Sequence, residues 1–175
     1  MKLSLLILFT LLSGVLFAQK DTVRLREIEK SKRAIVTDRP PQAVYFLIGG
    51  SGPILSVNYD RRFGKRVNGF GFAGGLGFYA IFGVNIFSVP VSLNYLIGRN
   101  SHFIEIAGGA TYVTATSDLF TDEVETESAL IYHLNAGYRY QPTRGGFFVR
   151  AGVSPLFSGY GESITSYYIG LGHNF

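Results

Sequence analysis

An all-β fold built from antiparallel strands is predicted by two features of the sequence. From residue 43 onward, large apolar side chains alternate with small or polar ones at a period of two, which is typical of strands with two unlike faces. The chain is also 47% hydrophobic and 15% aromatic but only 16% charged, whereas charged residues are about a quarter of a soluble domain. Together these features indicate strands with one large apolar face and little charged surface.

Two segments precede this domain. Residues 1–18 have one early cation, Lys2, then an apolar run and Ala18 before Gln19, which is the pattern of a secretory signal peptide. The run is shorter than the roughly 20 apolar residues that a membrane-spanning helix needs. Residues 19–42 are charged and end in a double proline, so we expect a charged periplasmic leader outside the main domain, residues 43–175. The chain has no cysteine and therefore no disulfide.

The first four strands are expected at 43–50, 54–63, 69–80 and 87–98. The first is AVYFLIGG. The second sets Leu55, Val57 and Tyr59 against polar residues. The third, GFGFAGGLGFYA, sets phenylalanine and leucine against glycine and alanine, and the fourth sets apolar residues against serine and asparagine. This alternation predicts strands in which the unlike faces meet unlike surroundings.

The last four strands are expected at 102–113, 130–140, 147–155 and 166–175, by the same alternation. The connections 64–68, 98–101 and 141–146 are short and basic or turn-like. The connection 114–128 is longer and holds five carboxylates and no cation. We expect it to be a solvated loop outside the membrane.

The choice of which face meets water decides the fold. The polar face is too small and too poor in lysine and glutamate for a soluble exterior, whereas Gly71, Gly75 and Gly77 suit the crowded inside of an eight-stranded barrel. Lipid cannot satisfy an open sheet edge, so strands that cross a membrane must close. The sequence therefore predicts an eight-stranded, antiparallel, up-and-down transmembrane β-barrel. Its wall is expected to end at Phe175, which continues the apolar face.

The stretches SVNYDRRF, VPVSLNYLIG, GYRYQP and GGFFVRAGVSPLF, with the final Phe175, resemble the small outer-membrane β-barrel family of Gram-negative bacteria, of the OmpA/OmpX-like type. The resemblance covers roughly residues 43–175. It implies a porin-like protein of the cell envelope, located in the cell outer membrane and in contact with its lipid. It also implies that the barrel-assembly machinery reads the C-terminal strand, with Phe175 as the assembly signal.

A polar network is expected to fill the lumen. Its members are Asp60, Arg62, Glu105, His133, Arg139 and Arg150. Unpaired buried charges are costly, and eight strands leave little open bore, so we expect these groups to neutralise one another and to plug the barrel. The function expected from this is a structural or surface-interaction role, with the surface partner unknown.

Three other functions stay open: a narrow channel, a soluble lipocalin-like binder with the apolar face turned inward, and a lipid-modifying barrel enzyme that uses Glu127, Ser128 and His133. We expect no enzyme, because the sequence contains no nucleophile motif.

Three further sites are not expected. GFGFAG (69–74) precedes no helix, so it is no dinucleotide loop. The histidines have no metal-ligand spacing. Residues 43–175 carry eight cations and eight anions, so no nucleic-acid partner is indicated.

Overall fold

The computed structural model describes residues 37–175, except residues 53, 82, 118–124 and 160. Chain contacts separate Met1–Ala34 from Ile35–Phe175, and every described residue belongs to the second unit. The predicted signal peptide and most of the predicted leader lie outside the described residues. No helix long and apolar enough to cross a membrane occurs among the residues described.

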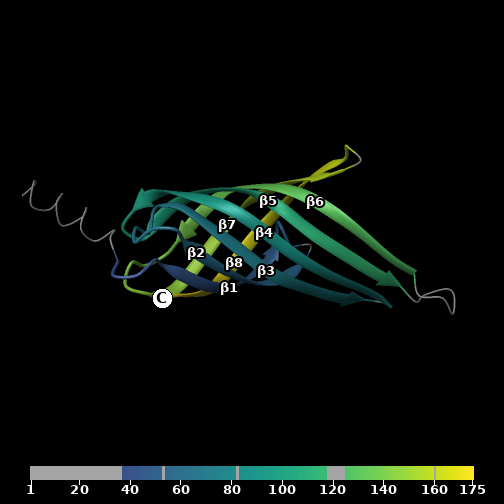
Figure 1. The fold of residues 1–175 in the computed structure, drawn as a ribbon, viewed down its shortest axis with the longest axis horizontal. Coiled ribbons are helices and arrows are strands. Elements are labelled where there is room, and N and C mark those ends of the chain that lie inside the picture. Colours follow the sequence, from purple (N-terminus) through teal and green to yellow (C-terminus); the bar gives the residue numbers. More distant parts are fainter. Residues whose placement is uncertain (1–36, 53, 82, 118–124, 160) are drawn as a thin grey trace, which may run out of the picture. The chain divides into compact units, whose positions relative to one another are not determined.

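Eight strands follow one another along the chain. They are β1 (Gln42–Gly49), β2 (Leu55–Arg62), β3 (Gly69–Ile81), β4 (Val84–Arg99), β5 (His102–Ser117), β6 (Glu125–Tyr140), β7 (Gly146–Ser158) and β8 (Ser163–Asn174). Each strand pairs antiparallel with the next, and β1 pairs with β8, so the sheet closes into a barrel (Figure 1). The backbones of Gln42 and Phe175 complete this closure with two hydrogen bonds of 3.1 and 2.9 Å. The predicted eight-stranded antiparallel barrel is confirmed.

The two ends of the barrel are distinguished here by their connections. The terminal end carries Gln42, Phe175 and the turns 63–68, 100–101 and 141–145. The far end carries the opposite strand ends, which include Gly49, Ile81, Ser117 and Ser158.

Several strands reach further toward the far end than the sequence predicted. β4 begins at Val84, β5 continues to Ser117 and β6 begins at Glu125. The predicted bounds of the acidic loop, 114–128, are therefore wrong: residues 114–117 pair with 125–128 as strand, and the connection is 118–124. In the extension of β6, residues 126–130 are exposed on both faces of the strand. Because neither face is buried, apolar and polar residues do not alternate there, and the sequence did not predict a strand.

The ladders are unequal in length, and this leaves a gap in the far end of the wall. The β1–β8 ladder runs only from Ala43↔Asn174 to Gly49↔Tyr168, and the β1–β2 ladder from Gln42↔Arg61 to Ile48↔Leu55. The β5–β6 ladder runs from His102↔Tyr140 to Ser117↔Glu125. Residues 163–167 of β8 and 78–81 of β3 therefore extend past the β1–β2 hairpin with no ladder partner on that side (Figure 1).

The outer face of the barrel is apolar and exposed. Phe46 is 59% exposed, Leu93 61% and Ile104 59%, and similar residues continue around the wall on all eight strands. Polar groups are instead buried on the inner face, where Asp60 is 0% exposed and Arg139 0%. A soluble lipocalin-like barrel would need the reverse arrangement, so that alternative is wrong. An apolar exterior around a polar interior is the arrangement of a transmembrane β-barrel.

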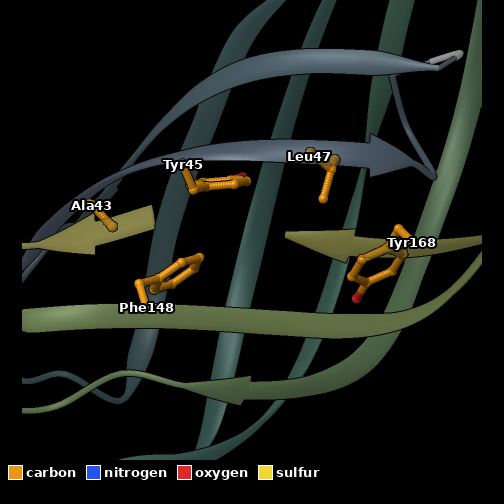
Figure 2. Packing of buried hydrophobic residues seen from close by; sticks show 5 residues of the cluster. All are labelled: Ala43, Tyr45, Leu47, Phe148 and Tyr168. Carbon is orange, nitrogen blue, oxygen red and sulfur yellow. The ribbon is translucent and has the colours of Figure 1, made fainter. Parts of the chain in front are cut away.

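The inner face is not uniformly small or polar, however. Tyr45, Leu47, Phe148 and Tyr168 are buried there together with Ala43, and Figure 2 shows them projecting into the barrel from β1, β7 and β8. The rings of Tyr45 and Phe148 lie 5.1 Å apart, centroid to centroid. One cluster of large interior residues thus lies along the wall next to the β1–β8 seam.

Glycines on β3 make room for the long polar side chains opposite them. A Cβ atom at Gly71 would collide with the guanidinium of Arg62 and would lie 2.6 Å from the Arg61 carbonyl oxygen. A Cβ atom at Gly75 would collide with the amide oxygen of Asn58. The glycine-rich face of β3 is therefore what allows Arg62 to be buried on the inner wall.

Candidate functional site

The interior site is centred on the carboxylate of Asp60, on β2. Arg62 donates from Nη2 to both carboxylate oxygens at 2.8 Å. Arg139 binds the same carboxylate with two nitrogens, at 3.0 and 2.8 Å, and Asn94 donates to it at 2.6 Å. Arg62 also donates to the amide oxygen of Asn94. A paired guanidinium–carboxylate contact of this kind is both strong and directional.

The pairing of Asp60 with Arg139 spans the lumen. Asp60 lies on β2 and Arg139 on β6, and these strands are four positions apart in a closed ring of eight. They therefore lie on opposite walls of the barrel. A contact of 2.8 Å between them places two charged side chains across the middle of the bore.

A second carboxylate, Glu105 on β5, is shared by two arginines. Its Oε1 lies 3.2 Å from Arg150 Nη2 and 3.5 Å from Arg139 Nη1, with all three side chains almost fully buried. Arg150 also donates to the Tyr45 hydroxyl at 2.7 Å. Glu105 thereby links the Asp60 centre to the aromatic cluster beside the seam.

Three guanidinium groups thus face two carboxylates, which leaves one positive charge in excess. Aromatic ring faces offset part of this excess. Arg139 lies 4.6 Å from the centroid of Phe148, and Arg150 lies 5.2 and 5.0 Å from those of Tyr45 and Tyr168. Rings at these distances attract a cation through their quadrupole, and the effect is larger where water is excluded.

His133, the sixth residue predicted for the network, lies apart from it. It is buried on the inner face of β6, where its Nδ1 is 3.3 Å from the hydroxyl of Thr111 on β5. Thr111 donates to the carbonyl of Ser51, in the β1–β2 turn, at 2.7 Å. Because β1 and β5 are on opposite walls, this bond holds the turn across the far-end mouth.

The terminal-end mouth is occupied by an apolar contact. Val67, in the turn between β2 and β3, is fully buried with Leu96 and Phe103 of β4 and β5. Thr37 is tied to the same turn by a backbone hydrogen bond of 2.7 Å to Lys65. The turn therefore folds inward over the lumen.

Tyr45 and Gln141 belong to the interior site although the sequence did not single them out. Gln141 accepts a hydrogen bond from Arg139 Nε at 2.9 Å. It shares the odd-numbered face of His133 and Arg139, so the period-two pattern extended by one residue would have found it. Tyr45 gave no such signal, because β1 is apolar on both faces.

The residues considered for catalysis are not brought together. Ser128 bonds to Tyr112 at 3.0 Å and Thr114 at 3.2 Å at the far end of the barrel, while His133 is buried on the inner face. Glu127 is exposed. Within the described part of the chain, no three histidine, aspartate or glutamate side chains are placed to hold a metal ion.

Phe175, the predicted assembly signal, lies on the outer face and is 60% exposed. Its backbone pairs with Gln42 at the seam. The neighbouring His173 is also exposed and pairs with Val44 and Phe147 across the two adjoining ladders.

Comparisons with known proteins agree with this fold. No protein-family model and no curated protein matches the sequence. Among solved structures, the N-terminal β-barrel domain of Pseudomonas aeruginosa OprF is similar with a TM-score of 0.60 and 14% identity, over 80% of this chain and 99% of that one. Neisserial surface protein A has a TM-score of 0.50 and 14% identity, over 77% and 94%. The chain folds as a small eight-stranded transmembrane β-barrel of the outer-membrane type.

Proposed function

We propose that this protein is a non-conducting outer-membrane anchor whose far end carries a surface-interacting sheet. The observation that carries the proposal is the contact between Asp60 and Arg139, which joins opposite walls through the centre of the bore. A side chain held by paired charged hydrogen bonds on both sides of a narrow lumen is poorly suited to move aside for ions.

Two further contacts support a plugged lumen. At the far end, the β1–β2 turn crosses the mouth to reach Thr111. At the terminal end, Val67 packs over the bore against Leu96 and Phe103. The interior is thus obstructed at three levels along the barrel axis, with the charge network between two closures.

Planar-bilayer recording tests the closed lumen. The purified barrel, inserted at increasing protein concentration, is expected to show no stable open level at low voltage. Insertion is verified in parallel by the shift of the unboiled band on a gel, which a folded barrel shows and a boiled one does not. A long-lived open level with defined ion selectivity would make the protein a narrow channel and refute the plug.

The proposed orientation places the far end outside the cell. The described strands project furthest there, and the sequence 114–128 carries five acids and no cation. In contrast, Arg61, Lys65, Arg99 and Arg144 are exposed near the terminal end. In bacterial outer-membrane barrels the short turns face the periplasm, which matches the basic terminal-end turns.

Epitope insertion tests the orientation directly. A tag placed between residues 120 and 121 is expected to bind antibody on intact cells. The matched control carries the same tag between Arg144 and Gly145 and is expected to bind only after permeabilisation. The opposite result would invert the barrel and remove the surface role.

Recognition by the assembly machinery through Phe175 remains part of this proposal. Its support is the exposed ring on the outer face of the strand that closes the barrel. F175A is expected to reach the folded, heat-shifted form more slowly in cells than the wild type does. The control I169A, on the same face of β8, separates loss of the signal from loss of lipid contact. Equal delay in both variants would contradict a specific signal.

A further inference from the structure

The far end holds an apolar cavity that the proposed anchor role does not use. It has a volume of about 600 Å³ and is lined by three apolar residues, Ile131, Leu156 and Ile164, and three polar ones, Ser158, Glu162 and Ser163. Leu156 pairs with Ile164 across β7–β8 and with His133 across β6–β7, so the cavity lies on one continuous piece of wall.

The three apolar lining residues lie on the inner face of that wall. Ile131 shares the face of His133, Leu156 that of Ser154, and Ile164 that of Tyr168, because strand residues two or four apart point the same way. Toward the terminal end this inner face is polar or closely packed. On the far-end side of His133 and Ser154, which are 1% and 0% exposed, the inner face becomes apolar.

Ile164 shows that the cavity opens to the side. It is 69% exposed, although Tyr168, four residues further along the same face of β8, is 5% exposed. The difference arises because β1 ends at Gly49, opposite Tyr168, and leaves β8 residues 163–167 paired with β7 alone and without a ladder partner on the β1 side. The gap in the wall is thus directly beside the cavity.

The gap also adjoins the lipid-facing surface. Tyr167 on β8 and Phe78 on β3, the strands that flank the gap, are 76% and 61% exposed on the outer face. The apolar outer surface therefore reaches the level of the cavity. Ile48 and Leu55 are exposed on the outer face at the far end of the β1–β2 hairpin. They extend the apolar outer surface to the edge of the gap.

We infer that one acyl chain of a membrane amphiphile enters through the gap between β8 and β3 and binds in this cavity. Continuity of the cavity with the lipid-facing surface favours this occupant over a water-borne one. The cavity volume lies in the range of small-molecule pockets. The apolar lining residues suit the hydrocarbon tail, and Ser158, Glu162 and Ser163 offer hydrogen-bonding groups to a polar, uncharged or cationic head.

Photolabelling in nanodiscs tests the inference. The probe is phosphatidylcholine with a diazirine at the end of one acyl chain, and labelled residues are mapped by mass spectrometry. Leu93, on the outer face of β4, serves as the reference for ordinary lipid contact. Labelling of Ile131 and Leu156 at a level within about threefold of Leu93 is the expected result, estimated from their shared access to the bilayer. Labelled Leu93 with unlabelled Ile131 and Leu156 would overturn the proposal.

Two matched variants on β8 sharpen the test. I164D places a charge on the cavity side of the strand, and T165D places the same charge on the outer side, one residue away. I164D is expected to lower labelling of Leu156 about tenfold, the equivalent of one decade in affinity, while T165D leaves it within about twofold. Equal loss in both would overturn the proposal. Both must keep the heat shift on a gel, and I164N replaces I164D where the charge prevents folding.

A second copy of the chain is the competing occupant of the gap, because an unpaired strand can pair with its equivalent. The natural chain has no cysteine, so T165C supplies a single one at this edge. If T165C forms a disulfide-linked dimer on oxidation and the cavity stays unlabelled, the occupant of the gap is a second subunit and the lipid proposal is wrong. None of these outcomes depends on whether the lumen conducts, so failure here leaves the proposed anchor role separately testable.

Discussion

Removal of the Asp60 carboxylate tests whether the interior network stabilises the barrel. Asp60 accepts hydrogen bonds from Arg62, Arg139 and Asn94, and it is fully buried. In D60A two guanidinium groups lose this partner inside the lumen. Removing one member of a buried ion pair costs about 3–5 kcal/mol, because the other charge is left without compensation. We expect the free energy of unfolding to fall by that amount.

The charge balance supplies a sharper version of this test. D60N keeps an acceptor oxygen but raises the excess of guanidinium over carboxylate groups from one to two. D60N/R139M returns the excess to one. The double variant is therefore expected to be more stable than the sum of the single losses, with a coupling of about 0.5–3 kcal/mol.

Urea titration in detergent micelles, with the folded fraction read from the heat-shifted band, measures both quantities. E127A is the control, since Glu127 is exposed on the extension of β6 and surface changes cost about 0.5 kcal/mol or less. A loss in D60A no larger than that in E127A would mean that water already solvates the network, and the reasoning from burial would be refuted.

Three further changes have defined outcomes in the same assay. G109A should lose about 1–3 kcal/mol, because the added Cβ would lie 2.7 Å from the Ser92 backbone. G64A, with open space around it, is its control, and equal effects would contradict the packing argument. L93R should lose about 2–4 kcal/mol if that face meets lipid; a neutral result would not fit a membrane. Y45F removes the acceptor of Arg150 and should cost about 1–3 kcal/mol, whereas no loss would make that bond dispensable.

The alternation of side chains and the connections between strands were sufficient to predict the strand order and the faces of the residues in the predicted parts of β2 to β8. Asp60, Glu105 and Arg150 were placed inside the barrel because each falls on the small or polar face of its strand, opposite the large apolar residues. Their pairing was not predictable, since contact across a lumen depends on strand tilt and stagger rather than on sequence spacing. His133 has the correct face but the wrong level, for the same reason.

Other parts of the fold were hidden because the alternation itself was absent. β1 is apolar on both faces, so the buried position of Tyr45 could not be read from it. At the far end, residues 126–130 are exposed on both faces, and the strand resembled a loop. The apolar cavity could not be predicted from the sequence. Its apolar lining residues are far apart in the chain and come together only through the β6–β7–β8 ladders: Ile131, Leu156 and Ile164.

The uneven ladders also bear on how the barrel forms. β5 and β6 are adjacent in the sequence and share the long ladder from His102↔Tyr140 to Ser117↔Glu125, so their pairing closes a small loop of chain. The seam, from Ala43↔Asn174 to Gly49↔Tyr168, joins the first strand to the last across the whole domain and offers fewer bonds in return. Loop-closure entropy rises with the length enclosed, and non-local pairing slows folding. We therefore expect the β1–β8 ladder to form last during folding and to open first during unfolding.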